Sequence, residues 1–116
     1  MTRRTLAEFR AERETGQARI LATDHQGLKR LLRLDAAAYE DGALPAATKE
    51  LLGLVASAVL RCNDCIDYHL ERCVGAGIGR DEIVEALNVA VVVGGTIVIP
   101  HLRHALATLD EIENSR

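Results

Sequence analysis

The stretch from residue 62 to residue 69 holds the side chains best suited to chemistry in this chain. It reads Cys-Asn-Asp-Cys-Ile-Asp-Tyr-His, so Cys62 and Cys65 are separated by two residues and His69 follows four residues after Cys65. At about 100° per residue, one helix would place all three side chains on the same face. Cysteines three residues apart in a helical turn are also close enough to form a disulfide. The pattern therefore predicts a redox-active pair that cycles between dithiol and disulfide.

The thiol with the best-placed base is Cys65, because His69 lies one helical turn beyond it. A helix N-terminus and a neighbouring imidazole both stabilise the thiolate, which is the nucleophile. Glu50 lies twelve residues before Cys62. If the helix that carries Glu50 packs against the cysteine helix, this carboxylate could orient His69 or accept a proton. Asp64 stands directly before Cys65, where its negative charge would oppose formation of the thiolate.

Three other interpretations of the cysteines have to be weighed. A structural zinc site needs four ligands, so the fourth would be a distant group such as His101 or His104. Covalent haem attachment requires a histidine directly after the second cysteine, where this chain has Ile66. The pair could also be buried core residues on an amphipathic helix. Cys73 has no partner at a suitable spacing and is expected in the core.

The composition predicts an all-α fold that positions these residues. The chain has 116 residues, of which 48% are hydrophobic, 3% are aromatic and none is Trp. This length suits one domain, and strand-rich domains usually contain more aromatic residues. We expect a single helical domain of about five or six helices, in which residues 1–40 form an N-terminal helical arm of the same domain and residues 41–116 form the core.

Helix boundaries follow from apolar spacing and from capping residues. We expect helices at about 5–21, 24–39, 45–60, 62–75, 81–93 and 97–113. Asp24 is the expected N-cap of the second helix, and Pro45 suits the first turn of the third, which carries Glu50. Gly75 and Gly77 are expected to end the cysteine helix.

Charge and hydropathy exclude two classes of partner. Lys and Arg number 14 against 17 Asp and Glu, a net charge of −3, which does not favour binding to nucleic acid. The most apolar stretch, residues 89–99, is interrupted by glycines and is shorter than the ~20 residues of a membrane span. The N-terminus lacks an apolar signal core, so we expect a cytoplasmic protein. An element that is apolar all round favours burial between subunits, so we expect a homo-oligomer.

At the spacing of Glu50, eleven residues, Cys62-X-X-Cys65, three residues and His69, the chain resembles the alkylhydroperoxidase D-like branch of the carboxymuconolactone decarboxylase superfamily. The similarity runs from about Leu44 to His101, roughly half of the chain. The resemblance implies a helical trimer or hexamer with no cofactor or metal ion. It also implies that a hydroperoxide or disulfide oxidises Cys65, that Cys62 resolves the product, and that Glu50 and His69 relay protons.

The electron donor implied by the resemblance is a lipoyl-type dithiol or a thioredoxin-like protein. One position departs from the best-known peroxidase of this branch, which has a histidine where this chain has Asp64. This favours a general thiol–disulfide role. The alternatives are a decarboxylase-like activity on a lactone acid, as in the founding members of the superfamily, and a non-catalytic, stress-related oligomeric scaffold. His101 and Asp64 are expected to line the pocket, and His25 and His104 are expected at the surface.

Overall fold

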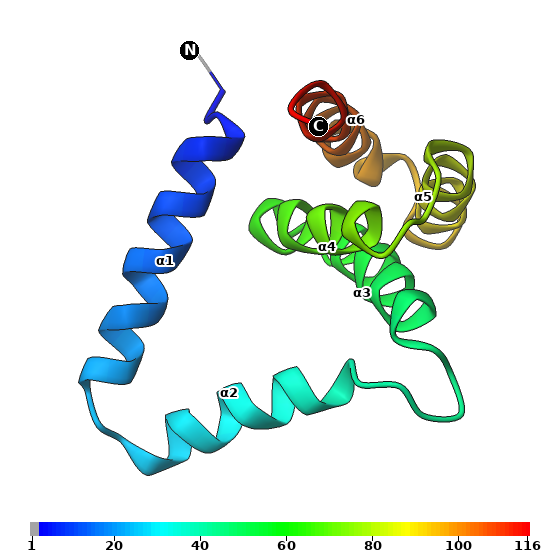
Figure 1. Cartoon of the computed structure of the whole chain (residues 1–116). Helices are drawn as coiled ribbons and strands as arrows, with labels where there is room; N and C mark the ends of the chain where they lie inside the picture. The colour runs from blue at the N-terminus through cyan, green and yellow to red at the C-terminus, as the bar shows by residue number, and fades with distance from the viewer. Residues whose placement is uncertain (1–2) are drawn as a thin grey trace. The chain divides into compact units, whose positions relative to one another are not determined.

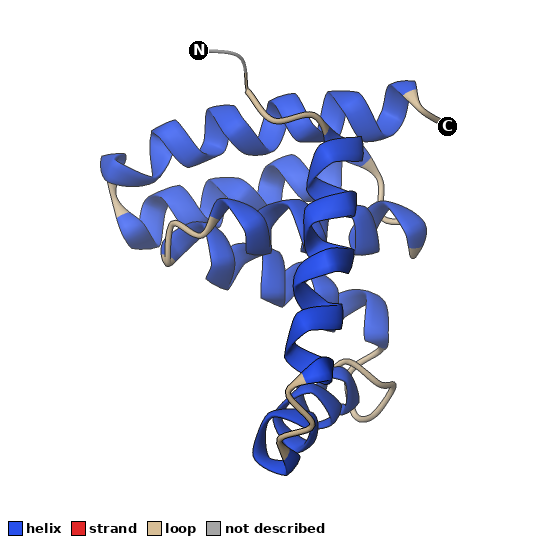
Figure 2. Cartoon of the chain, turned by 90° about the vertical axis from the view of Figure 1, so that its left-hand side faces the viewer, coloured by secondary structure: helices blue, strands red, loops and turns tan. Residues whose placement is uncertain are grey.

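The computed structural model describes residues 3–116, and every regular element in this range is a helix (Figures 1 and 2). The all-α prediction is therefore confirmed. The elements in chain order are α1 (Leu6–Ala22), α2 (Gln26–Ala38), α3 (Ala46–Val59), α4 (Asn63–Gly75), α5 (Arg80–Gly94), the short 3-10 helix η1 (Thr96–Val98) and α6 (Ile99–Asn114).

The boundary between α1 and α2 differs from the expectation by one residue. The predicted N-cap Asp24 is wrong, because its backbone N–H bonds to the Leu21 carbonyl at 3.1 Å and its φ is +54°. Asp24 thus ends α1 in the left-handed conformation that Asp tolerates. His25 caps α2 instead, since its Nδ1 accepts the Leu28 N–H at 3.2 Å. His25 is exposed, as expected.

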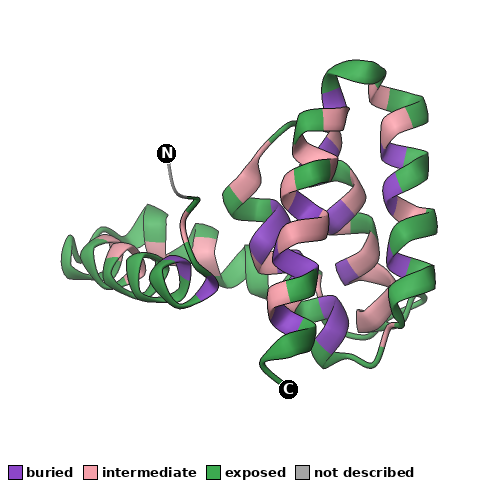
Figure 3. Cartoon of the chain, turned by 90° about the horizontal axis from the view of Figure 1, so that it is seen from above, coloured by how far each residue is buried: buried purple, intermediate pink, exposed green. Residues whose placement is uncertain are grey.

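The chain consists of two compact units, one up to Asp41 and one from Gly42. The first contains α1 and α2. Thr5 caps α1 by accepting the Glu8 N–H at 3.1 Å, and α2 has no buried residue. The leucines of α2 recur at helical spacing, and three of them are exposed, namely Leu28, Leu31 and Leu34. The burial pattern of both units is visible in Figure 3.

The second unit holds an apolar core between α3, α4, α5 and α6. Its fully buried large side chains come from all four helices: Leu54, Ile66, Leu70, Ile83, Leu87 and Leu109. Burying each such side chain contributes about 1.5–3 kcal/mol. Helix α4 packs against α3 and also against α6, and α3 packs against α5. The cysteine helix is therefore held from two sides.

The last turn of α6 is tied to the first residue of α5. Arg80 forms ion pairs with Asp110 at 2.9 Å and with Glu113. Several large apolar side chains of the second unit nevertheless remain exposed, namely Leu52, Leu60, Val89, Val92, Val93 and Ile97. None of the helices within residues 3–116 has the length and apolarity that a membrane span requires.

Candidate active site

Helix α3 ends directly at the first cysteine. Leu60 is the C-cap and Arg61 adopts a φ of +61°, a conformation that usually selects glycine. The N–H of Arg61 bonds to the Ala58 carbonyl and the N–H of Cys62 bonds to the Ser57 carbonyl, both at 3.0 Å. These two bonds form a Schellman motif, which satisfies the last carbonyls of α3. Cys62 is therefore placed by the end of α3 with no intervening loop.

Cys62 is at the same time the N-cap of α4. Its Sγ accepts the backbone N–H of Cys65 at 3.3 Å, and the two Sγ atoms lie 2.6 Å apart. Neither cysteine is in a disulfide; Cys62 is half-buried and Cys65 is exposed. N–H groups at a helix N-terminus interact favourably with negative charge. The structure thus brings the two cysteines together, with Cys65 accessible to a substrate and Cys62 capped by the backbone.

His69 and Glu50 form a buried pair between α4 and α3. The His69 Nδ1 and the Glu50 Oε1 are 2.9 Å apart, and the residues are 8% and 4% exposed. This is the pairing that the packing argument from the sequence anticipated. Gly53 makes room for the imidazole, because a Cβ at this position would come within 2.7–3.0 Å of three ring atoms. The orientation of His69 is therefore set by a carboxylate on one side and a glycine on the other.

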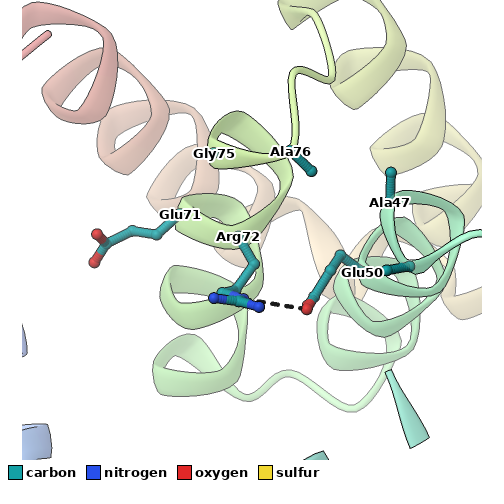
Figure 4. Close-up of a pocket in the computed structure, with 7 residues that line it drawn as sticks. Ala47, Glu50, Glu71, Arg72, Gly75 and Ala76 are labelled. Atoms are coloured by element: carbon teal, nitrogen blue, oxygen red, sulfur yellow. Dashed lines mark hydrogen bonds and ion pairs between the residues drawn. The ribbon is translucent and has the colours of Figure 1, made fainter. Parts of the chain in front are cut away.

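The second oxygen of Glu50 faces Arg72. Arg72 Nε donates to Glu50 Oε2 at 3.3 Å, and the Arg72 side chain is 60% exposed (Figure 4). A pocket of about 240 Å³ opens here between α3 and α4, lined by Ala46, Ala47, Glu50, Glu71, Arg72, Gly75 and Ala76. It reaches the Glu50 carboxylate from the side of Arg72. His101 and Asp64 are not among its lining residues.

A second set of polar contacts joins α4 to α6. The Asp67 carboxylate, 3% exposed, accepts hydrogen bonds from His104 Nε2 at 2.8 Å and from Thr108 Oγ1 at 2.7 Å. His101 Nδ1 lies 2.8 Å from Asn63 Oδ1. The expectation that His104 lies at the surface is wrong, because a buried carboxylate requires polar partners and His104 supplies one.

Cys73 lies in the core, as expected from its isolation in the sequence. Burial, followed by the nearby Glu50 charge, raises the pKa of its thiol to about 12. Cys73 is therefore held in the protonated form at neutral pH. Within residues 3–116, no group of three or more His, Cys, Asp or Glu side chains is arranged to hold a metal ion.

Sequence reasoning missed Gly53, Arg72 and Asp67. Gly53 had a signal, because a glycine inside an otherwise apolar helix weakens it by about 1 kcal/mol relative to alanine and calls for a packing reason. Arg72 lies three residues after His69, so both side chains project toward the same neighbour. Asp67 gave no local signal, since its partners lie 37 and 41 residues away.

Comparisons with known proteins identify a family and several relatives of this chain. A sequence model of the carboxymuconolactone decarboxylase family matches residues 26–110. An uncharacterized protein of the cox locus of Paracoccus denitrificans is 33% identical over 84 residues, covering 72% of this chain and 76% of that protein. An alkyl hydroperoxide reductase AhpD of Anaeromyxobacter dehalogenans is 39% identical over 67 residues, covering 54% of this chain and 36% of that protein.

Solved structures give the same result. The crystal structure of TM1620 from Thermotoga maritima has a TM-score of 0.91 at 50% identity, covering 93% of this chain and 95% of that one. A second crystal structure of TM1620 has a TM-score of 0.77 at 56% identity, covering 78% of this chain and 94% of that one. TM1620 is described as a carboxymuconolactone decarboxylase family protein for which involvement in an antioxidative response is suggested.

Proposed function

The chain belongs to the carboxymuconolactone decarboxylase family, and from this premise we propose that it is a thiol-dependent oxidoreductase that reduces hydroperoxides or disulfides through Cys62 and Cys65. The observation that carries the proposal is the buried pair, at 2.9 Å, between Glu50 of α3 and His69 of α4, the helix whose N-cap is Cys62. A nucleophile, a base and a group that orients the base are the parts of an activated-nucleophile site. The likeness to an alkyl hydroperoxide reductase and to a protein for which involvement in an antioxidative response is suggested supports this choice.

The first half-reaction oxidises the pair. The Cys65 thiolate attacks the terminal oxygen of a hydroperoxide, the O–O bond breaks, and the leaving alkoxide takes a proton to become an alcohol. Cys65 is then a sulfenic acid. The Cys62 thiolate attacks the Cys65 sulfur and the hydroxide leaves as water, so that two electrons have passed from the dithiol to the peroxide. His69 and Glu50 accept the thiol protons and return them to the leaving oxygens.

The second half-reaction restores the dithiol. A dithiol donor, of the lipoyl type or on a thioredoxin-like protein, attacks one sulfur of the disulfide, and its second thiol completes the exchange. The donor becomes a disulfide and two protons return to Cys62 and Cys65. Such donors belong to the reducing cytoplasm, where we place the protein. For a disulfide substrate the same exchange runs in the opposite direction.

We further propose that the active form is a homo-oligomer, a trimer or a hexamer. The exposed valines of α5 and Ile97 of η1 support this, because contiguous apolar patches on a monomer usually mark an interaction surface. Val92 and Val93 are 75% and 70% exposed. Light scattering on the purified protein tests the proposal, and a monomer at all concentrations would contradict it.

Mass spectrometry of the reduced protein, after addition of one equivalent of an organic hydroperoxide, tests the redox function. We expect a rapid loss of two hydrogens, mapped by peptide digestion to a Cys62–Cys65 bridge. Cys65→Ser should form no bridge. Cys73→Ala is the matched control, since it removes the third, buried thiol and should leave the bridge intact. Thiols that stay reduced in the wild type would overturn the proposal.

A further inference from the structure

Asn63, which directly follows Cys62, forms a hydrogen bond with a histidine of another helix. Asn63 is the first residue of α4, and its Oδ1 lies 2.8 Å from the Nδ1 of His101 on α6. Both residues are half-buried. With a carbonyl oxygen as acceptor, the His101 Nδ1–H donates. The turn that contains the redox pair is thus fastened to α6 through its own second residue.

This contact acts on the part of α4 that would otherwise be weakest. The first turn of a helix lacks intrahelical partners for its N–H groups and frays readily. Here the N–H of Cys65 is satisfied by the Cys62 sulfur at 3.3 Å. A thiolate accepts this hydrogen bond better than a disulfide sulfur does, because ionised acceptors form the stronger bonds. A contact that keeps the Cys65 N–H directed at the Cys62 sulfur therefore favours the thiolate, and with it the reduced pair, over the disulfide.

We propose that His101 is a positioning residue for the Cys62–Cys65 couple: by holding Asn63 it stabilises the dithiol form and raises the reduction potential of the pair. Stabilisation of the reduced form makes a dithiol–disulfide couple more oxidising. The inference rests on the proposed redox function, which requires the pair to cycle. His101 acts through Asn63 and needs no contact with the substrate.

The neighbouring contact of α6 supplies the matched control. His104 lies three residues after His101 on the same helix, and its Nε2 bonds to Asp67 at 2.8 Å, beyond both cysteines. Loss of this contact should loosen the packing of α6 on α4 without releasing Asn63. If both α6 histidines had a purely structural role, alanine variants of His101 and His104 would have the same dithiol–disulfide equilibrium constant.

The experiment equilibrates wild type, His101→Ala, His101→Gln and His104→Ala with glutathione buffers. One dithiol and one glutathione disulfide give one Cys62–Cys65 disulfide and two reduced glutathione molecules, and acid quenching followed by mass spectrometry gives the ratio. We expect His101→Ala to favour the disulfide by about three- to tenfold, a potential about 15–30 mV more negative. His101→Gln retains a donor and should restore most of the wild-type value. His104→Ala should leave the equilibrium unchanged while lowering the unfolding midpoint.

Asn63→Ala removes the same hydrogen bond from the other helix and guards against a His101 variant that does not fold. Its shift should match that of His101→Ala, and the double variant should shift no further, since both changes remove one interaction. If the wild type forms the Cys62–Cys65 disulfide reversibly but the His101 and Asn63 variants have the same equilibrium constant, this inference is overturned and the proposed function is not. A wild-type protein that forms no Cys62–Cys65 disulfide in any glutathione buffer overturns the proposed function and this inference with it.

Discussion

Helix α4 carries two histidine–carboxylate pairs on its two sides, and their surroundings differ. On the α3 side, His69 meets Glu50, whose other oxygen faces the exposed Arg72 and a pocket of about 240 Å³. On the α6 side, Asp67 meets His104 and the buried Thr108. The Glu50 carboxylate of the first pair lines the pocket beside Arg72. In the second, the carboxylate is closed in by its partners. The same chemical pairing therefore has two settings: in the proposed function the His69–Glu50 pair takes part in catalysis, whereas the Asp67–His104 pair joins α6 to α4.

The strongest test of the difference between the two pairs is to neutralise Glu50. Glu50→Gln keeps the shape of the side chain but removes the charge that orients and supports the His69 imidazole. We expect hydroperoxide turnover with a small dithiol donor to fall by about 10²–10⁴-fold, the usual contribution of a positioned acid–base group. The rate of bridge formation in stopped-flow experiments measures it. A rate within threefold of the wild type would remove Glu50 from the site.

The complementary change is Asp67→Ala. It leaves His104 and Thr108 without their shared acceptor, and we expect the free energy of unfolding to drop by about 2–4 kcal/mol. Urea denaturation measures this loss. The folded fraction should retain its peroxide reactivity to within a few-fold, because Asp67 faces α6. A rate loss as large as that of Glu50→Gln would show that the two sides are not distinct.

The thiol pKa of the buried Cys73 depends in part on the charge of Glu50. Its thiol pKa is raised from 9.0 to about 12, first by burial and then by Glu50. The folded state therefore holds this proton more tightly than the unfolded state, so its contribution is present below pH 9 and is lost as the pH rises toward 12. We expect stability to fall in this window by up to about 1.4 kcal/mol per pH unit more in the wild type than in Cys73→Ala. Equal slopes for the two proteins would contradict the buried, protonated thiol.

The smallest change expected to distinguish the two sides is Gly53→Ala. The added Cβ would meet the His69 ring at 2.7–3.0 Å and should displace it from Glu50 by a few tenths of an ångström. We expect turnover to fall by about three- to tenfold, since small misplacements of a catalytic group are costly. Gly16→Ala in α1 is the control, because nothing lies within 4 Å of its added Cβ. The control should raise helix stability by up to about 1 kcal/mol and leave turnover unchanged. Equal turnover in both variants would argue against a positioning role for Gly53.

The helices were predictable because their signals are local. Apolar spacing, Gly75 and Gly77 place the cysteine helix within a residue or two of its observed bounds. The N-cap prediction for Asp24 was wrong because aspartate is common both at N-caps and in the left-handed conformation that ends a helix. Only the bond from its N–H to the Leu21 carbonyl distinguishes the two. The boundary thus depended on a choice that residue type leaves open.

The site was predictable on one side of α4 only. Glu50 and His69 lie on consecutive helices joined without a loop, so their meeting follows from packing one helix on the next. The partners of Asn63 and Asp67 come from α6, 37 to 41 residues further along the chain. Nothing in local spacing indicates which face of a distant helix will dock. Long-range polar contacts of this kind require the tertiary arrangement itself.

The Schellman turn at Leu60–Arg61–Cys62 also determines where the chain can change length. Leu60 is the C-cap of α3 and Cys62 is the N-cap of α4, so an insertion here would disrupt the Schellman motif and displace α4 relative to Glu50. The segments before α3 and between α4 and α5 are turns outside any helix and can lengthen without moving a sulfur atom. Insertions, affinity tags or a permuted chain start should therefore be tolerated at those two segments. In contrast, the number of residues between Glu50 and Cys62 cannot change without changing the position of the carboxylate relative to the thiols.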